Sequence, residues 1–253
     1  MWRGKSFTHK TRWQGEISAA VCVDLIQKLD NVKIERYNVD SVKFGREFME
    51  KKSYHHKNLK NDLIEKGIEL VDKYGINQLS LRKVAQACNV SHAAPYSHFS
   101  SKEQLLQAMQ LHITNQFAEV LEDTVSKYQN TPDFLFEFGK AYISFFMKRP
   151  QYFSFLFHQG SINIDLDADG NKESNYRPFT IYKEQILKLI ADTDISQSKK
   201  EDFVIALFAY VHGLTALTTM KNIHYSHKWE DKLYDLIKIF SCEFWEDLWL
   251  EYI

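Results

Sequence analysis

The stretch that decides the fold is GINQLSLRKVAQACNVSHAAPYSHFSSKEQLL, residues 75–106. It contains two short apolar patterns separated by Asn89, a residue that tolerates the left-handed backbone of a tight turn. The first pattern begins at Ser80 and the second at Ser91, and either serine can cap a helix. Two short helices joined by a tight turn are typical of a helix-turn-helix, although an ordinary helical hairpin gives the same pattern.

The segments around this turn also predict helices. An amphipathic pattern runs from Leu59 to Lys73. In the short helix expected from His92 to Phe99, Pro95 lies in the first turn, where its missing N–H costs little. Ser100 and Glu103 then form a predicted capping box that opens a long helix.

Composition limits the class of protein. The 253 residues include only 9 Gly and 4 Pro, which favours helices over turn-rich β architectures. No apolar run approaches the ~18 residues that span a bilayer, and the three cysteines have neither disulfide nor zinc-ligand spacing. We therefore expect an all-α cytoplasmic protein with no membrane contact.

Charge is distributed unevenly along the chain. Residues 1–105 carry 18 Lys and Arg against 12 Asp and Glu, whereas residues 106–253 carry 14 against 21. A basic amino-terminal part on an acidic body is typical of a protein whose amino-terminal part meets a polyanion.

The stretch quoted above resembles the DNA-binding signature of the TetR family of bacterial transcription regulators. The matching features are Gly75, Leu79-Ser80-Leu81, Val84-Ala85, Asn89-Val90-Ser91, Tyr96, His98-Phe99, and Lys102-Glu103 with Leu105. Asn89 stands where the family usually has Gly, and Asn is the least disruptive replacement at a left-handed position. The resemblance covers roughly residues 50–106 and implies a homodimer that binds a double-stranded DNA operator.

The resemblance also implies roles for individual residues. The helix after Asn89 would enter the major groove, where His92 is the long hydrogen-bonding side chain best placed for direct base readout. Tyr96 and Lys102 resemble the family's phosphate-binding positions, and the helix that begins after Ser80 presents its N-terminus to phosphate. The predicted DNA-binding residues are Tyr54, His55, His56, Ser80, Leu81, Arg82, Ser91, His92, Ala93, Ala94, Pro95, Tyr96, His98 and Lys102.

The run from Met49 to Lys60 resembles the start of one TetR branch, in which a basic Tyr-His-His arm leads into the first helix. Residues 1–48 have no counterpart in that branch, which favours Met49 as the initiator. The alternative is a genuine appendage, since the apolar residues between Ile17 and Leu29 fit one amphipathic helix. The expected division is an extension at 1–48, a helix-turn-helix domain at 49–105, and an effector-binding and dimerisation domain at 106–253.

The carboxy-terminal part predicts a dimer interface. Small residues at three- and four-residue spacing on the helix expected at 197–219 would let another helix approach closely. The last helix, expected at 228–250, offers a second apolar stripe, and two such helices per subunit form the interface of TetR-family dimers. The predicted interface residues are Ala206, Ala209, Gly213, Ala216, Leu233, Ile237, Phe240 and Phe244.

Aromatic residues are concentrated between Phe134 and Phe157. Core packing explains each of them singly, while the family resemblance implies an apolar effector pocket in this region. His212-Gly213 resembles the Trp-x-x-x-His-Gly (WHG) hallmark of one TetR subclass, with Phe208 at the Trp position. The predicted pocket residues are Phe138, Tyr142, Phe146, Phe153, Phe157, Phe208 and His212.

Neither a metal site nor a catalytic site is predicted. The acidic run Asp165-Leu-Asp-Ala-Asp-Gly170 begins like a calcium loop but has Tyr176 at its twelfth position, and His224 and His227 lack further ligands. We therefore expect no cofactor and no enzyme. The resemblance implies a repressor released by a small apolar or amphipathic effector; the alternative is an architectural or scaffold DNA-binding protein without an effector.

Overall fold

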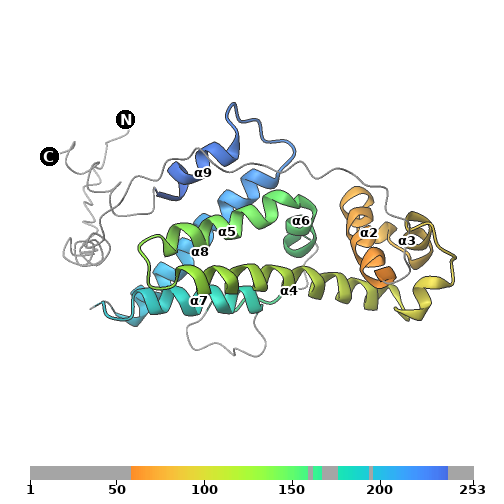
Figure 1. The fold of residues 1–253 in the computed structure, drawn as a ribbon, viewed down its shortest axis with the longest axis horizontal. Coiled ribbons are helices and arrows are strands. Elements are labelled where there is room, and N and C mark those ends of the chain that lie inside the picture. The colour runs from red at the N-terminus through yellow and green to blue at the C-terminus, as the bar shows by residue number, and fades with distance from the viewer. Residues whose placement is uncertain (1–57, 159–161, 167–175, 194–195, 239–253) are drawn as a thin grey trace, which may run out of the picture. The chain divides into compact units, whose positions relative to one another are not determined.

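A computed structural model describes residues 58–158, 162–166, 176–193 and 196–238, and every regular element in these residues is a helix (Figure 1). The elements are α2 (Leu59–Tyr74), η2 (Ile76–Gln78), α3 (Leu81–Ala87), η3 (Ala94–Ser97), α4 (Lys102–Tyr128), α5 (Phe134–Lys148), α6 (Pro150–His158), α7 (Arg177–Leu189), α8 (Gln197–Thr219) and α9 (Trp229–Lys238). The prediction of an all-α chain, with a helix-turn-helix domain before a helical carboxy-terminal domain, is confirmed.

The N-cap of α4 lies one residue later than predicted. The Ser101 hydroxyl, not that of Ser100, accepts the backbone N–H of Gln104 at 3.3 Å. The Gln104 side-chain oxygen in turn accepts the backbone N–H of Ser100 at 2.5 Å. Ser101 is therefore the N-cap of α4, and the Gln104 side chain bonds the residue before the cap, so the predicted pair of Ser100 and Glu103 is wrong.

The short helix predicted at 92–99 is a 3-10 helix, η3, with only four residues. Its hydrogen bonds join residues three apart: Tyr96 N–H donates to Ala93 at 3.1 Å and His98 N–H donates to Pro95 at 3.0 Å. Pro95 has no N–H and therefore cannot make the α-helical bond back to Ser91. The Ala94 N–H makes the tighter bond to the Ser91 carbonyl instead, at 3.0 Å.

Helix α4 supplies side chains to the core along most of its length. Leu105, Met109, Ile113, Phe117 and Leu121 recur at every fourth position, and all five are fully buried. The helix packs against α2 and against α5, α6 and α7. The boundary predicted between residues 105 and 106 therefore falls inside a continuous helix.

Aromatic rings fill the space between α4 and α5. The ring centroid of Phe117 lies 4.9 Å from that of Tyr142 and 4.7 Å from that of Phe146, and it stacks on Phe145 at 4.9 Å. Edge-to-face and offset pairs at these separations add to the stabilisation from burial. Helix α8 packs on α5, and α9 also packs on α5 (Figure 1).

Replacing Ile113 by Ala should lower the free energy of unfolding by about 2–5 kcal/mol, because the side chain is fully buried and its removal leaves a cavity. The matched control is Leu111→Ala on the same helix, where the side chain is 59% exposed and the change should stay within ~0.5 kcal/mol. Urea unfolding of both variants measures the difference. Equal losses would contradict the assignment of the buried face of α4.

Candidate nucleic-acid interface

Helix α3 is held against the rest of the motif by its apolar face. Leu81, Val84 and Ala85 are buried, and the Val90 N–H closes the turn by donating to the Ala85 carbonyl at 3.0 Å. Asn89 has a φ of 56°, the left-handed conformation that the tight turn requires. The prediction of a left-handed turn at Asn89 is confirmed.

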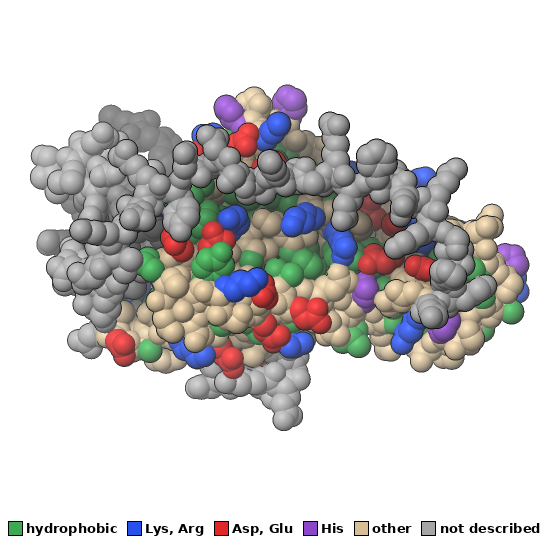
Figure 2. Space-filling view, viewed as in Figure 1, with side chains coloured by type: hydrophobic (Ala, Val, Ile, Leu, Met, Phe, Trp, Pro, Cys, Tyr) green, Lys and Arg blue, Asp and Glu red, His purple; other side chains and the backbone are tan. Residues whose placement is uncertain are grey.

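The residues after the turn face solvent. Tyr96 is 54% exposed, and Figure 2 shows histidine and basic side chains at the end of the molecule that carries α3. The predicted DNA-binding residues that are exposed are Arg82, Ser91, His92, Ala93, Tyr96 and His98, and those that are half-buried are Ser80, Ala94 and Lys102. The motif therefore presents an imidazole, a guanidinium and a phenol from one short stretch of chain.

Two predicted contact residues pack inward instead. Leu81 is only 5% exposed and Pro95 is buried, so their side chains complete the core of the motif. At these two positions only the backbone is left to meet DNA. The predicted arm residues Tyr54, His55 and His56 lie outside the described residues.

Sequence reasoning missed Lys83, which follows Arg82 in the first turn of α3 and is exposed. Its Nζ donates to the Gln78 side-chain oxygen at 3.0 Å, and its backbone N–H donates to the Ser80 hydroxyl at 3.3 Å. Two adjacent cations at a helix N-terminus are suited to phosphate. The signal was the Arg-Lys pair directly after a capping serine.

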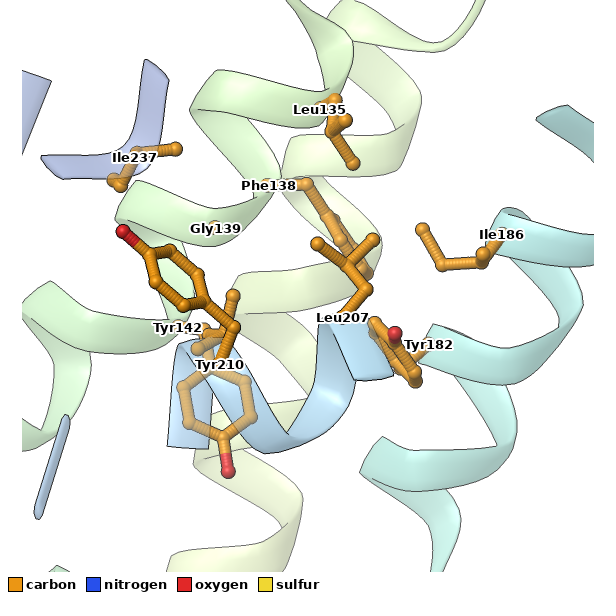
Figure 3. A pocket seen from close by; sticks show the side chains of 10 residues that line it. Leu135, Phe138, Gly139, Tyr142, Tyr182, Ile186, Leu207, Tyr210 and Ile237 are labelled. Carbon is orange, nitrogen blue, oxygen red and sulfur yellow. The ribbon is translucent and has the colours of Figure 1, made fainter. Parts of the chain in front are cut away.

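The carboxy-terminal domain contains a small apolar cavity between α5, α7, α8 and α9 (Figure 3). Its lining is Leu135, Phe138, Gly139, Tyr142, Tyr182, Ile186, Leu207, Tyr210, Val211 and Ile237. The cavity measures about 20 Å³, which is room for roughly one water molecule. Of the predicted pocket residues, only Phe138 and Tyr142 line it.

Three of the other predicted pocket residues surround His212, and Phe146 packs on two of them, Phe153 and Phe157. Ring centroids of Phe153, Phe157 and Phe208 lie 5.0, 4.6 and 5.4 Å from the imidazole, and the Tyr142 hydroxyl lies 3.1 Å from its Nδ1. Burial, and to a lesser extent the nearby His158, lowers the pKa of His212. The neutral imidazole accepts a hydrogen bond at Nδ1 from the Tyr142 hydroxyl, which keeps its proton because burial holds the pKa of Tyr142 well above its usual value.

The predicted dimer-interface residues fall into two groups, one exposed on α8 and one buried on α9. Ala206, Ala209 and Gly213 are exposed on one face of α8, and a Cβ placed on Gly213 would meet no atom within 4 Å. Leu233 and Ile237 of α9 instead pack within the same chain and are only 6% and 8% exposed. Ala216 is half-buried, while Phe240 and Phe244 lie outside the described residues.

The described residues contain no group of three His, Cys, Asp or Glu side chains that could hold a metal ion. Of the acidic run considered as a calcium loop, the described part ends at residue 166. His224 and His227 are both exposed.

Comparison with known proteins gives a match for the amino-terminal domain. The sequence model described as bacterial regulatory proteins, tetR family, matches residues 63–109. This range contains α3, η3 and the start of α4. No curated protein matches the chain.

Solved structures share the fold. A protein of unknown function from Rhodococcus sp. RHA1 aligns with a TM-score of 0.56 and 22% identity, over 77% of this chain and 97% of its own. A tetR-family regulatory protein from Rhodococcus RHA1 gives 0.55 and 15%, over 73% and 98%. A fatty acid degradation regulator from Bacillus halodurans gives 0.55 and 12%, over 75% and 97%.

The chain therefore has the fold of a helix-turn-helix transcriptional regulator. Residues 63–109 match the tetR-family sequence model, and the resemblance to this family inferred from the sequence is confirmed. The assignment to the WHG subclass stays a prediction.

Replacing Asn89 by Ala should lower the free energy of unfolding by about 1–2 kcal/mol, because a Cβ-bearing residue without a local polar group is strained at positive φ. Asn89→Gly is the matched control, since Gly adopts this conformation freely. Chemical unfolding should rank the Gly variant above the Ala variant. The reverse order would contradict a strained position.

Stability should fall as the pH drops from about 7.5 to 5.5, and His212 should contribute to the fall. Its pKa is lowered in the folded chain, so the unfolded chain takes up a proton near the ordinary value while the folded chain does not. The variant His212→Gln should lose less stability over this range than the wild type. Identical pH slopes for the two proteins in urea unfolding would refute this role.

Proposed function

We propose that the protein is a homodimeric, sequence-specific DNA-binding repressor that a small apolar or amphipathic effector releases from its operator. The observation that carries the proposal is the exposure of His92, Ala93 and Tyr96 at the end of a motif whose packing is complete without them. Side chains that contribute nothing to the core are free to meet base edges and phosphates.

Dimerisation would use the exposed face of α8. Besides its small residues, this face and the residue after the helix expose Ile205, Leu217 and Met220 by 38%, 41% and 45%. By length and composition alone, α8 is the one described helix that could cross a membrane, although the sequence was expected to contain no apolar run near that length. A second copy of the chain would cover its outer face while α5 and α7 cover its inner face, which accounts for its apolar composition in a cytoplasmic protein.

The small size of the cavity supports regulation by an effector, because a ligand could enter only if the surrounding helices moved. Ligand pockets usually measure some 300–1,000 Å³, whereas this one measures about 20 Å³. An effector could enter only by separating α5 from α8 or α9, so binding and helix displacement would be coupled. The hydroxyls of Tyr142, Tyr182 and Tyr210 already bond to His212 and to the Val204 and Leu236 carbonyls, so the lining left to a ligand is apolar.

The same small volume favours a second candidate function. A body whose cavity stays closed would act as a scaffold for dimerisation, and the protein would bind DNA without an effector. The two candidates differ in one observable, because only the first predicts DNA release by a small molecule.

Selection of bound duplexes from a random library at physiological salt tests DNA binding. The expected result is a palindrome whose half-sites lie about one helical turn apart. Within it, His92→Ala should relax the preference at one position per half-site and cost about 1–3 kcal/mol. Lys102→Ala should instead weaken all sequences equally and lower the salt slope by about one. Equal losses on selected and random DNA for both variants would contradict these roles.

The effector is tested by adding acyl compounds of increasing chain length to the protein–operator complex. They are the first probes because the lining is apolar and one protein of this fold is a fatty acid degradation regulator. Release by one length range, together with a raised melting temperature of the free protein, is expected. Binding that every compound leaves unchanged would support the scaffold candidate.

A further inference from the structure

One carboxylate, that of Glu65 in α2, contacts two helices of the body. Glu65 of α2 accepts a hydrogen bond from the Tyr152 hydroxyl of α6 at 2.5 Å. The same oxygen, Oε1, lies 2.8 Å from Nε2 of His112 on α4. A single side chain of the DNA-binding domain therefore joins α2 to two helices of the body, across sequence separations of 87 and 47 residues.

The body holds its side of this contact in place. Arg149, at the junction of α5 and α6, donates to the Tyr152 hydroxyl at 3.0 Å and to the Gln116 side-chain oxygen at 2.7 Å. Its guanidinium also lies 5.1 Å from the centre of the Tyr152 ring. Burial and the Glu65 carboxylate raise the pKa of Tyr152 to about 12, so its hydroxyl keeps the proton that it donates.

The centre of α2 packs closely on the body, whereas its carboxy-terminal end borders a cleft. α2 and α4 touch closely at Gly67, where an added Cβ would lie 3.0 Å from the Met109 sulfur. Towards the end of α2 there is instead a polar cleft of about 210 Å³, whose lining includes Asp72, Ser154, His158 and Lys221. Asp72 stands seven residues after Glu65, on the same face of the helix, and its carboxylate pairs across the cleft with Lys221 at 3.0 Å.

We propose that Glu65 is a positioning residue, which sets the angle of the DNA-binding domain on the body through Tyr152 and His112. The Asp72–Lys221 pair is a second and weaker contact, since the Lys221 side chain is 80% exposed. Regulation follows from this role, and that part rests on the proposed function. A displacement of α6 would withdraw the Tyr152 hydroxyl and release α2.

A chain of aromatic contacts links this contact to the cavity. The Tyr152 ring lies 6.0 Å from Phe145, Phe145 stacks on Phe117 at 4.9 Å, and Phe117 meets Tyr142 edge-on at 4.9 Å. Tyr142 lines the cavity. Rings packed this closely cannot be displaced one at a time, so widening the cavity at Tyr142 would be felt at Tyr152.

The angle is measured by double electron–electron resonance between spin labels at Gln86→Cys on α3 and Lys188→Cys on α7, both exposed positions. Cys22 and Cys242 are replaced by Ser and Cys88 is buried, so the two introduced cysteines take the label. Labelled chains are diluted with unlabelled chains to suppress distances between subunits. The full-length protein without DNA should give one narrow distance distribution. Glu65→Ala and Tyr152→Phe should broaden or shift it.

The matched control is Glu122→Ala, which removes a glutamate of similar exposure paired with Arg177 at 2.6 Å within the body. It should leave the distribution unchanged. The proposal is overturned if Glu65→Ala gives the wild-type distance distribution, or if Glu122→Ala alters the distribution as much as Glu65→Ala does. Tyr152→Phe keeps the ring and removes only the hydroxyl, so a change in its distance distribution reports the lost hydrogen bond and not lost packing.

A second readout separates this inference from the proposed function. On the selected palindrome, Tyr152→Phe should bind about tenfold more weakly than the wild type, while the affinity for a single half-site should be unchanged. Equal losses on both duplexes would indicate a merely structural role and would overturn the proposal. A wild type that selects no DNA would refute the proposed function, and the label distances would still decide the role of Glu65.

Discussion

One buried stripe on α4 holds the described structure together. Five side chains, from Leu105 to Leu121, recur at intervals of four residues and are all fully buried. An interval of four falls slightly beyond one helical turn of 3.6 residues, so the stripe winds gradually around the helix. Its beginning faces α2 and its later part faces α5 and α7. One helix can therefore serve two groups of partners, and the two domains share a core instead of being joined by a linker.

The helix-turn-helix could be predicted because its signals are local. A capping serine, an apolar face and a residue that tolerates positive φ act within a few positions of one another, and Ser80, Val84 and Asn89 behave as their chemistry requires. The errors in this region are also local. Ser100 and Ser101 are both good caps by residue type, and the structure shows that the Ser101 hydroxyl accepts the Gln104 N–H. Pro95 was expected at the start of a helix, but it also prevents that helix from being α-helical.

The candidate site in the body could be predicted only as a region. Aromatic density pointed to the segment that forms α5 and α6, whereas the cavity lies between α5, α7, α8 and α9. Spacing does not say which rings line a cavity and which pack around His212. Tyr182 and Tyr210 reach the cavity from helices distant in the sequence. Ile237 was expected at the dimer interface, and it packs within the chain against Gly139, 3.6 Å from where a Cβ on that residue would lie. Glu65 and Tyr152 could not be paired from sequence at all, since no periodicity connects α2 with α6.

The separation between the exposed residues proposed to read DNA and the buried residues that support them has an evolutionary consequence. Substitutions at His92, Ala93 or Tyr96 leave the core of the motif intact, because Leu81, Val84, Pro95 and Phe99 hold it without them. Most mutations destabilise the fold, and selection removes those that destabilise it too far. Substitutions at these three positions leave the core intact, so selection for stability does not remove them. A duplicated gene for this protein could therefore acquire a new operator by changing a handful of surface codons, with no compensating change elsewhere in the chain.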